Sequence, residues 1–218
     1  MIKLKNVTKK YGDKTVYDNF SFAFDEDRIT AFLGESGAGK TTLLNIIAGL
    51  TDYDGEVIKD GDVSFVFQTD RLVKNLTVKE NLKLVLKNAT EKDILDALDS
   101  VGLSAAIDLY PKELSAGMAR RVAILRAFLY PCKILLMDEP FINLDVSLKF
   151  SLINTVKKMQ GITPKTVVFV THDIKEAVSL SDRVAVVKDG KIIFYEKNVN
   201  EKTEEEIFDL FMKNADLK

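Results

Sequence analysis

Residues Arg28–Gly49 read R-I-T-A-F-L-G-E-S-G-A-G-K-T-T-L-L-N-I-I-A-G, and they contain the strongest structural signal in the chain. Ile29–Leu33 is a short, nearly continuous apolar run, which is typical of a parallel strand buried on both faces. Gly34–Thr41 follows directly and fits the pattern G-x-x-x-x-G-K-S/T. Apolar residues then recur at helical spacing up to Gly49, which favours a helix end. The stretch predicts a strand, a glycine-rich loop and a helix in succession.

The loop has the residue types that bind a polyphosphate. Glycines let the backbone turn tightly and bring its N–H groups close to phosphate oxygens, and the following helix N-terminus favours an anion. Lys40 is expected to reach the β- and γ-phosphates, and the Thr41 hydroxyl to ligate Mg²⁺. An ordinary turn would match the four fixed positions by chance in well under about one chain in a hundred. The expected nucleotide-binding residues here are Gly34, Glu35, Ser36, Gly37, Ala38, Gly39, Lys40, Thr41 and Thr42.

Size and composition favour a soluble globular protein of one large or two small domains, with 218 residues, 46% hydrophobic and 29% charged. The net charge of −2 gives no sign of nucleic-acid binding. No apolar run approaches the ~20 residues of a membrane helix, and Met1–Lys5 has no signal-peptide core. The lone Cys132 excludes an internal disulfide, is compatible with a reducing compartment and is expected to be a buried, inert thiol. We interpret the protein as cytosolic.

The remaining patterns predict an α/β chain with a helical insertion between Gln68 and about Tyr130. In the first half we expect antiparallel strands at Ile2–Val7 and Val16–Phe24 around a turn at Tyr11-Gly12-Asp13. A hairpin region is expected at Asp52–Gly61 and a further strand at Val63–Phe67. Helix starts are expected at Thr77-x-x-Glu80 and Thr90-x-x-Asp93. In the second half we expect strands at Ile134–Met137 and Thr166–Thr171, helices at Val146–Gln160 and from His172 to Ser181, a hairpin of Arg183–Lys188 with Lys191–Glu196, and a last helix over Thr203–Asn214 capped by Thr203 and Glu206.

Two acids, Asp138 and Glu139, follow the apolar strand Ile134–Met137. Nucleotide hydrolysis requires a strand end that delivers a carboxylate to Mg²⁺ beside the phosphate loop. Asp138 suits the metal, usually through water, and Glu139 suits the general base that polarises the attacking water. The alternative is a solvated acidic turn after a core strand, but the phosphate loop favours the functional interpretation.

Leu114–Met118, L-S-A-G-M, precedes an apolar helix, and two interpretations of it stay open. Ser115 is a candidate N-cap, and most segments of this kind only cap a helix. The same segment could present hydroxyl and N–H donors to a phosphate.

Together these motifs resemble the ATP-binding cassette family, the nucleotide-binding subunits of ABC transporters, over essentially the whole chain and in the family's order. Gly34–Thr41 resembles the Walker A loop and Ile134–Asp138 the Walker B strand. The other matches are Gln68 for the Q-loop glutamine, Leu114–Met118 for the signature L-S-G-G-Q, Asn143-Leu144-Asp145 for the D-loop, His172 for the switch histidine and Tyr11 for the aromatic that stacks on adenine.

The resemblance implies an α/β fold with a P-loop NTPase core and a mostly parallel sheet, an N-terminal antiparallel β subdomain and an inserted α-helical subdomain. We expect one domain over residues 1–218, with the β subdomain at about 1–27 and 52–62, the helical subdomain at about 70–130 and the RecA-like core in the remainder.

The family also implies that two cassettes dimerise head to tail, so that each ATP lies between the Walker A loop of one subunit and the signature of the other. By resemblance, the residues that contact the ATP of the partner subunit are Ser115, Ala116, Gly117, Met118 and Asp145.

Within one subunit the resemblance assigns catalysis to Glu139, His172 and Gln68, and Mg²⁺ binding to Thr41, Gln68 and Asp138. A lone histidine is more often structural than catalytic, but His172 lies at the end of a strand, which supports contact with the γ-phosphate. For Tyr11, edge packing and adenine stacking are about equally favoured. The neighbouring lysines Lys9, Lys10 and Lys14 are interpreted as solvated.

The signature departs from the family at two positions, with Ala116 for the third-position glycine and Met118 for the glutamine. A β-carbon at Ala116 either fits helical geometry or crowds the phosphate, because only a glycine with positive φ would be irreplaceable. We predict near-normal signature function. Asn143 is a further departure, since a small residue is commoner in the D-loop.

The resemblance implies an ATPase subunit, peripheral on the inner face of the cell membrane, that drives a transporter with ATP and Mg²⁺. The segments Phe67–Leu72 and Thr171–Ala177 resemble the nitrate, sulfonate, taurine and thiamine-precursor importers. The expected partners are a second copy of the chain, transmembrane permease subunits that dock near Gln68–Leu76, and an external substrate-binding protein. The alternatives are an exporter or lipoprotein-extraction cassette, a soluble cassette that acts on DNA or ribosomes, and a non-hydrolysing nucleotide-binding module.

Overall fold

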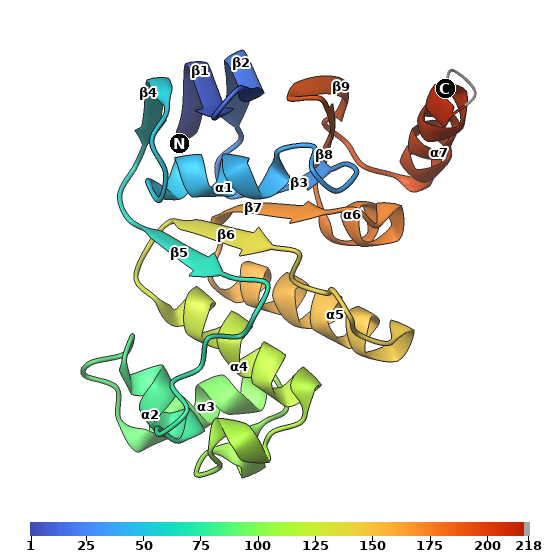
Figure 1. The fold of residues 1–218 in the computed structure, drawn as a ribbon. Coiled ribbons are helices and arrows are strands. Elements are labelled where there is room, and N and C mark those ends of the chain that lie inside the picture. Colours follow the sequence, from blue (N-terminus) through green and yellow to red (C-terminus); the bar gives the residue numbers. More distant parts are fainter. Residues whose placement is uncertain (216–218) are drawn as a thin grey trace.

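The computed structural model describes residues 1–215, drawn in Figure 1. The strands are β1 (Ile2–Tyr11), β2 (Lys14–Phe24), β3 (Ile29–Leu33), β4 (Asp54–Lys59), β5 (Val63–Val66), β6 (Ile134–Asp138), β7 (Thr166–Thr171), β8 (Arg183–Lys188) and β9 (Lys191–Glu196). The α-helices are α1 (Lys40–Ala48), α2 (Val78–Lys83), α3 (Glu91–Ser100), α4 (Ala116–Leu129), α5 (Val146–Ile162), α6 (Ile174–Leu180) and α7 (Glu201–Ala215), with short 3-10 turns at Ser104–Ala106 and Pro111–Glu113.

The larger sheet has the strand order β5-β6-β7-β3-β8-β9, and its neighbours pair in parallel except for the antiparallel β8–β9 hairpin. Every residue of β3, β6 and β7 is buried, which explains why these strands read as continuous apolar runs. The carboxyl ends of parallel strands meet at one edge of a sheet, where ligands of such folds bind. The sheet therefore brings the residues that follow β3, β6 and β7 together.

The smaller sheet is antiparallel, with the order β2-β1-β4. Helix α1 lies between the two sheets (Figure 1), and its apolar residues join one buried cluster with residues of both. This α/β architecture, with an N-terminal antiparallel sheet and a mostly parallel second sheet, confirms the predicted fold class. The subdomain boundaries given above remain our proposal.

The predicted hairpin region at Asp52–Gly61 is wrong, because this segment contains one strand, β4, which pairs with β1. Gly55 explains the error. It adopts a φ of +101°, and a β-carbon there would lie 2.4 Å from the Asn6 carbonyl oxygen, where the β1–β4 register shifts. The glycine therefore allows a β-bulge and close backbone approach rather than a turn.

Helices α2 and α3 begin as predicted, since Thr77 with Glu80 and Thr90 with Asp93 both form capping boxes. The predicted start of the last helix is wrong, because α7 already begins at Glu201. The Asn200 side chain accepts from Lys202 N–H, and the Thr203 hydroxyl accepts from Asn200 N–H. Thr203 thus belongs to the first turn and closes a cap centred on Asn200.

Across the part of the chain that is described, no helix combines the length and apolar character needed to span a bilayer.

Candidate nucleotide-binding site

The phosphate loop connects β3 to α1 and is packed tightly. Gly39 adopts a φ of +97°, and a β-carbon there would lie 2.8 Å from a methyl group of Val16. The Tyr17 hydroxyl donates to the Gly39 carbonyl oxygen at 3.0 Å. Both restraints hold the Gly39 backbone in its left-handed conformation, which turns that bind anions commonly use.

Lys40, the first residue of α1, lies over this loop. Its Nζ donates to the carbonyl oxygens of Gly34 at 2.8 Å and Glu35 at 3.0 Å, and the side chain is buried. Burial lowers the pKa of Lys40 and outweighs the opposing attraction of Glu139 and Asp138. A polyanion bound at the loop would supply negative charge that stabilises the buried ammonium group of Lys40.

Thr41 and Asp138 lie side by side at the loop, and the Thr41 hydroxyl donates to Asp138 Oδ1 at 3.0 Å. Burial raises the pKa of Asp138, against the hydrogen bond from Thr41, which lowers it. A divalent cation would compensate for the burial of an ionised Asp138 carboxylate. The two adjacent oxygen ligands, from Thr41 and Asp138, are of the hard type that Mg²⁺ prefers.

Protein groups alone would leave such a cation incompletely ligated. Among residues 1–215 no group of three or more His, Cys, Asp or Glu side chains is arranged to hold a metal ion. Mg²⁺ is usually bound by one or two protein oxygens together with substrate phosphates and water, so the donor set fits a metal that arrives with a nucleotide.

Glu139 and His172 follow β6 and β7, and they face each other with His172 Nδ1 3.3 Å from Glu139 Oε2. The Glu139 backbone adopts a φ of +42°, which is uncommon for a residue with a β-carbon. Its N–H donates to the Val170 carbonyl oxygen at 3.1 Å, which holds the turn. Backbone strain of this kind is frequent at functional sites.

Open space adjoins these residues on both sides of the loop. A pocket of about 740 Å³ is lined by residues of the phosphate loop and by residues at or after the ends of β5, β6 and β7, including Gln68, Asp138, Glu139 and His172. A second pocket, of about 280 Å³, joins Tyr11 and Lys14 to the start of α1. The structure therefore brings the predicted loop, catalytic and metal residues around adjoining cavities.

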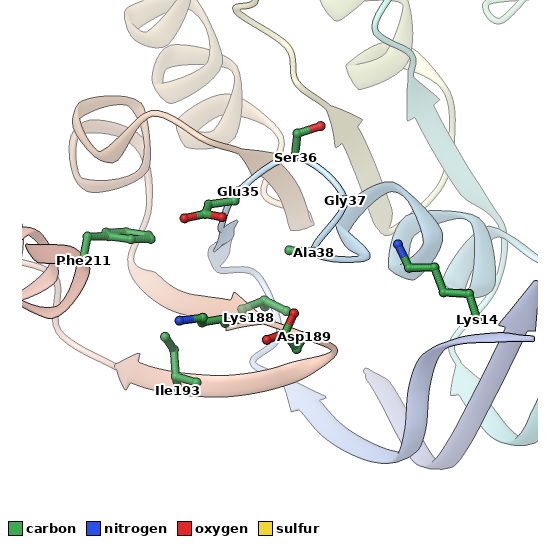
Figure 2. A pocket seen from close by; sticks show the side chains of 10 residues that line it. Lys14, Glu35, Ser36, Gly37, Ala38, Lys188, Asp189, Ile193 and Phe211 are labelled. Carbon is green, nitrogen blue, oxygen red and sulfur yellow. The ribbon is translucent and has the colours of Figure 1, made fainter. Parts of the chain in front are cut away.

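Figure 2 shows a third pocket, of about 500 Å³, beside the outer side of the loop. In Figure 2, Glu35 and Ala38 lie between Lys14 on the right and Phe211 of α7 on the left, with Lys188 and Asp189 at the β8–β9 turn below them. Lys14 is exposed, as expected for a solvated lysine, and it lines both this pocket and the one that contains Tyr11.

Tyr11 ends β1, and the residue is 49% exposed, so it is not buried in the core. Lys9 Nζ lies 4.5 Å from the ring centroid, and Lys9 is itself buried and paired with Asp52 at 2.8 Å. The interpretation of Lys9 as solvated is therefore wrong, because this ion pair compensates for burial of its charge. The cation supports one face of the ring.

The residues expected to meet the partner's ATP lie elsewhere. None of the described residues Ser115–Met118, nor Asp145, lines the three pockets around the phosphate loop. Ser115 accepts from the N–H of Met118 at 3.2 Å as N-cap of α4, and Asp145 accepts from the N–H of Leu148 at 2.9 Å as N-cap of α5. In this chain both therefore have a capping role.

Ala116 and Gly117 form the first turn of α4. Ala116 is exposed and lies within the helix, so its β-carbon fits helical geometry without strain. Gly117 is buried, and a β-carbon there would lie 2.6 Å from a methyl group of Leu148. A larger residue at Gly117 would therefore require the Leu148 side chain to move.

Arg120 is a buried residue that the sequence reasoning missed. It lies on the side of α4 that also carries Gly117 and Ile124, both buried, at helical spacing. A charge on an apolar stripe is the signal that could have drawn attention to it, because buried arginines are rare unless they are paired.

The comparisons with known proteins agree with this geometry. Residues 17–142 match the ABC transporter family. This chain belongs to the ABC transporter family. The cassette is 40% identical over 202 residues to the aliphatic sulfonates import ATP-binding protein of Bacillus cereus, an alignment that covers 86% of this chain and 80% of that protein.

Two longer relatives are import proteins as well. The Fe(3+) ions import ATP-binding protein of Fusobacterium nucleatum is 37% identical, and the alignment covers 88% of this chain and 56% of that protein. The spermidine/putrescine import ATP-binding protein of Pasteurella multocida is 36% identical, and the alignment covers 88% of this chain and 57% of that protein. The chain thus spans little more than half the length of these curated relatives. Their names confirm the resemblance to import cassettes.

Solved structures share the fold. An ATP-binding cassette determined as a dimer in a post-hydrolysis state with ADP and Pi has a TM-score of 0.77 and 32% identity, with 90% of this chain and 98% of that chain covered. A Clostridium perfringens subunit of the transporter complex cbiONQ has a TM-score of 0.82 and 24% identity, with 100% of this chain and 94% of that chain covered. This similarity supports the fold alone.

Proposed function

We propose that this ABC cassette is the ATP-binding and ATP-hydrolysing subunit that energises a membrane transporter, an importer of a small solute. The observation that carries the proposal is the meeting of two pairs at the phosphate loop, Thr41 with Asp138 and Glu139 with His172. A cation site and a base–histidine pair beside a polyphosphate cradle are the parts that phosphoryl transfer to water needs. The import function of the relatives supports the direction of transport.

In this proposal Lys40 and the loop N–H groups bind the β- and γ-phosphates, and Tyr11 stacks on adenine. Glu139 accepts a proton from the water whose oxygen attacks the γ-phosphorus, while the bond to the bridging β–γ oxygen breaks and ADP leaves. His172, which is 57% exposed, is free to turn from Glu139 toward the γ-phosphate.

Thr41, Asp138 and Gln68 would hold the Mg²⁺. When bound, the ion neutralises charge on the phosphate oxygens and fixes their orientation. Burial raises the pKa of Asp138, and a bound cation would favour its ionised form.

The exposed start of α4 supports a head-to-tail dimer. Ser115, Ala116, Gly117, Met118 and Asp145 would contact the ATP of the partner subunit, because N–H groups of a helix start suit a phosphate. Permease subunits and an external substrate-binding protein complete the proposed transporter, and they place the cassette on the inner face of the cell membrane.

The test is purification of the native chain from its membranes in mild detergent, followed by ATPase assay of the isolated complex. We expect a permease with several membrane helices to copurify and to stimulate hydrolysis. A matched preparation that carries Lys40→Ala should keep the permease but lose ATP binding. Recovery without any membrane partner would contradict the transport role, and ATP binding unaffected by Lys40→Ala would remove this residue from the phosphate site.

A further inference from the structure

The Arg120 guanidinium joins three segments that the proposed function uses. Its Nε donates to the Pro140 carbonyl oxygen at 2.6 Å, just after Glu139. One terminal nitrogen donates to the Phe67 carbonyl oxygen at 2.7 Å, just before Gln68. Arg120 itself lies on α4, which begins at the signature residue Ser115. A single side chain thus connects the signature helix with both catalytic segments.

Further contacts strengthen each connection. On the Gln68 side the same terminal nitrogen pairs with Asp70 Oδ1 at 3.1 Å and lies 3.5 Å from the Gln68 carbonyl oxygen. On the Glu139 side the other terminal nitrogen lies 3.5 Å from the Glu139 carbonyl oxygen. The planar guanidinium can direct several donors at once, which an ammonium group cannot do with the same geometry.

The burial of Arg120 makes these contacts consequential. Burial lowers the pKa of the guanidinium, while Asp70 opposes the shift. A buried charge is tolerated only when its donors are satisfied, so the loss of one acceptor segment would leave unpaired donors. The side chain therefore favours the arrangement in which both segments are held at once.

Both segments also contain strained backbone. Arg71 adopts a φ of +46° and Glu139 a φ of +42°, in the left-handed region that residues with a β-carbon rarely occupy. Strain of this kind persists only where surrounding contacts fix the backbone. Arg120 supplies contacts next to both positions.

We propose that Arg120 is a positioning residue that keeps Gln68 and Glu139 in fixed register with each other and with the signature helix. This inference rests on the proposed ATPase function. Through Arg120, a displacement of the α4 start on assembly moves the carbonyl groups that flank the water-activating and metal-sensing residues. This role differs from that of a catalytic residue, because Arg120 does not line the cavity that Asp138 and His172 line.

The experiment compares Arg120→Met with Arg121→Met in the intact chain. Arg121 is the neighbouring arginine on α4, and it donates to the Val101 carbonyl oxygen at 3.5 Å, away from the site. For Arg120→Met we expect kcat for ATP hydrolysis to fall by about tenfold or more, with the Kd of a fluorescent ATP analogue changed by less than about threefold. Arg121→Met should keep both values near those of the wild type.

Hydrogen exchange separates positioning from general destabilisation. Arg120→Met should raise exchange in segments 67–72 and 139–143, with the strands β3 and β7 as protected as in Arg121→Met. Two milder variants keep the test informative if Arg120→Met does not fold. Arg120→Lys keeps the charge, and Asp70→Asn keeps an oxygen acceptor, so both should lower kcat by smaller factors.

A kcat within about twofold of wild type in Arg120→Met and Arg120→Lys would overturn the proposal. So would a uniform rise in exchange over the whole chain in Arg120→Met, Arg120→Lys and Asp70→Asn, which would mark Arg120 as a general structural residue. Failure of the ATPase function itself is recognised separately, because the wild-type chain would then show no hydrolysis in the same assay.

Discussion

The phosphate-loop site and the start of α4 differ in how their polar side chains are paired within the chain. At the loop, Lys40 is buried, Thr41 binds Asp138, and Glu139 faces His172. At the start of α4, Ser115 and Ala116 are exposed. There the contact of the Ser115 side chain is the cap on Met118 N–H.

In the proposed function, this difference indicates that each catalytic site is shared between two chains. The loop region is preorganised within one chain, so it should bind nucleotide alone. The start of α4 does not line the pockets at the loop of its own chain, so in the proposed function it can contact a nucleotide only in a second copy. The following experiments alter one region at a time, beginning with the largest expected effect.

Asp138→Asn tests whether the loop region alone holds the cation. Loss of the carboxylate should lower ATP hydrolysis by about hundredfold or more, because charge stabilisation of phosphoryl transfer is lost. ATP with Mg²⁺ should raise the Tm of the wild type but raise that of the variant much less. Equal stabilisation of both by the Mg²⁺ complex would exclude Asp138 from the metal site.

The same carboxylate has a defined pH dependence without nucleotide. Since the pKa of Asp138 is raised in the folded state, its protonated form favours folding at low pH, and this contribution is lost as pH rises through the folded pKa. At neutral pH the ionised group therefore destabilises the nucleotide-free chain. We expect Asp138→Asn to match or exceed the wild-type Tm there, and a lower Tm would contradict the raised pKa.

Ser115→Asp tests the second region. Aspartate remains a good N-cap, so the fold should be unchanged, but its negative charge repels the γ-phosphate of the partner's ATP. We expect kcat to fall by about tenfold or more while the Kd for ATP of the isolated monomer stays unchanged. A weaker Kd would mean that Ser115 belongs to the nucleotide site of its own chain.

Tyr11→Ala tests the edge of the loop region. Removal of the exposed ring should weaken ATP binding by roughly tenfold, about 1.4 kcal/mol, within the range of base–aromatic stacking. Tyr11→Phe is the matched control and should bind as the wild type does, since it keeps the ring beside Lys9. Unchanged affinity in Tyr11→Ala would assign the ring no role in binding.

Ala116→Gly should have the smallest effect. Ala116 already fits the first turn of α4, so glycine removes no strain and slightly weakens the helix. We expect the steady-state ATPase rate to change by much less than about tenfold. A rise of more than that would show that the methyl group crowds the partner's phosphate.

The two regions also differ in how far the sequence predicts them. Asp138, Glu139 and His172 follow buried parallel strands, so topology brings them to the loop once the strands are identified. The pairing of β4 with β1 could not be predicted in this way, because Gly55 signals a turn and a bulge equally well. The position of strand pairs depends on contacts between distant residues.

Contacts between segments that lie far apart in the sequence could not be predicted either. Arg120 contacts the Phe67 and Pro140 carbonyl oxygens, which are backbone groups with no signature in the sequence. The position of Lys14 in the lining of two pockets likewise depends on how the β1–β2 turn lies beside the loop. Patterns of residue type identify the chemical groups, whereas these contacts need the folded chain.

The most direct test of the divided site is the molar mass of Glu139→Gln in solution with and without ATP. Hydrolysis should nearly stop, since a general base contributes about 10²–10⁴-fold, and ATP should remain bound between two chains. Light scattering should give a monomer without ATP and a dimer with it, and addition of Ser115→Asp should return the mass to that of a monomer. A Glu139→Gln variant that binds ATP but stays monomeric would contradict the account.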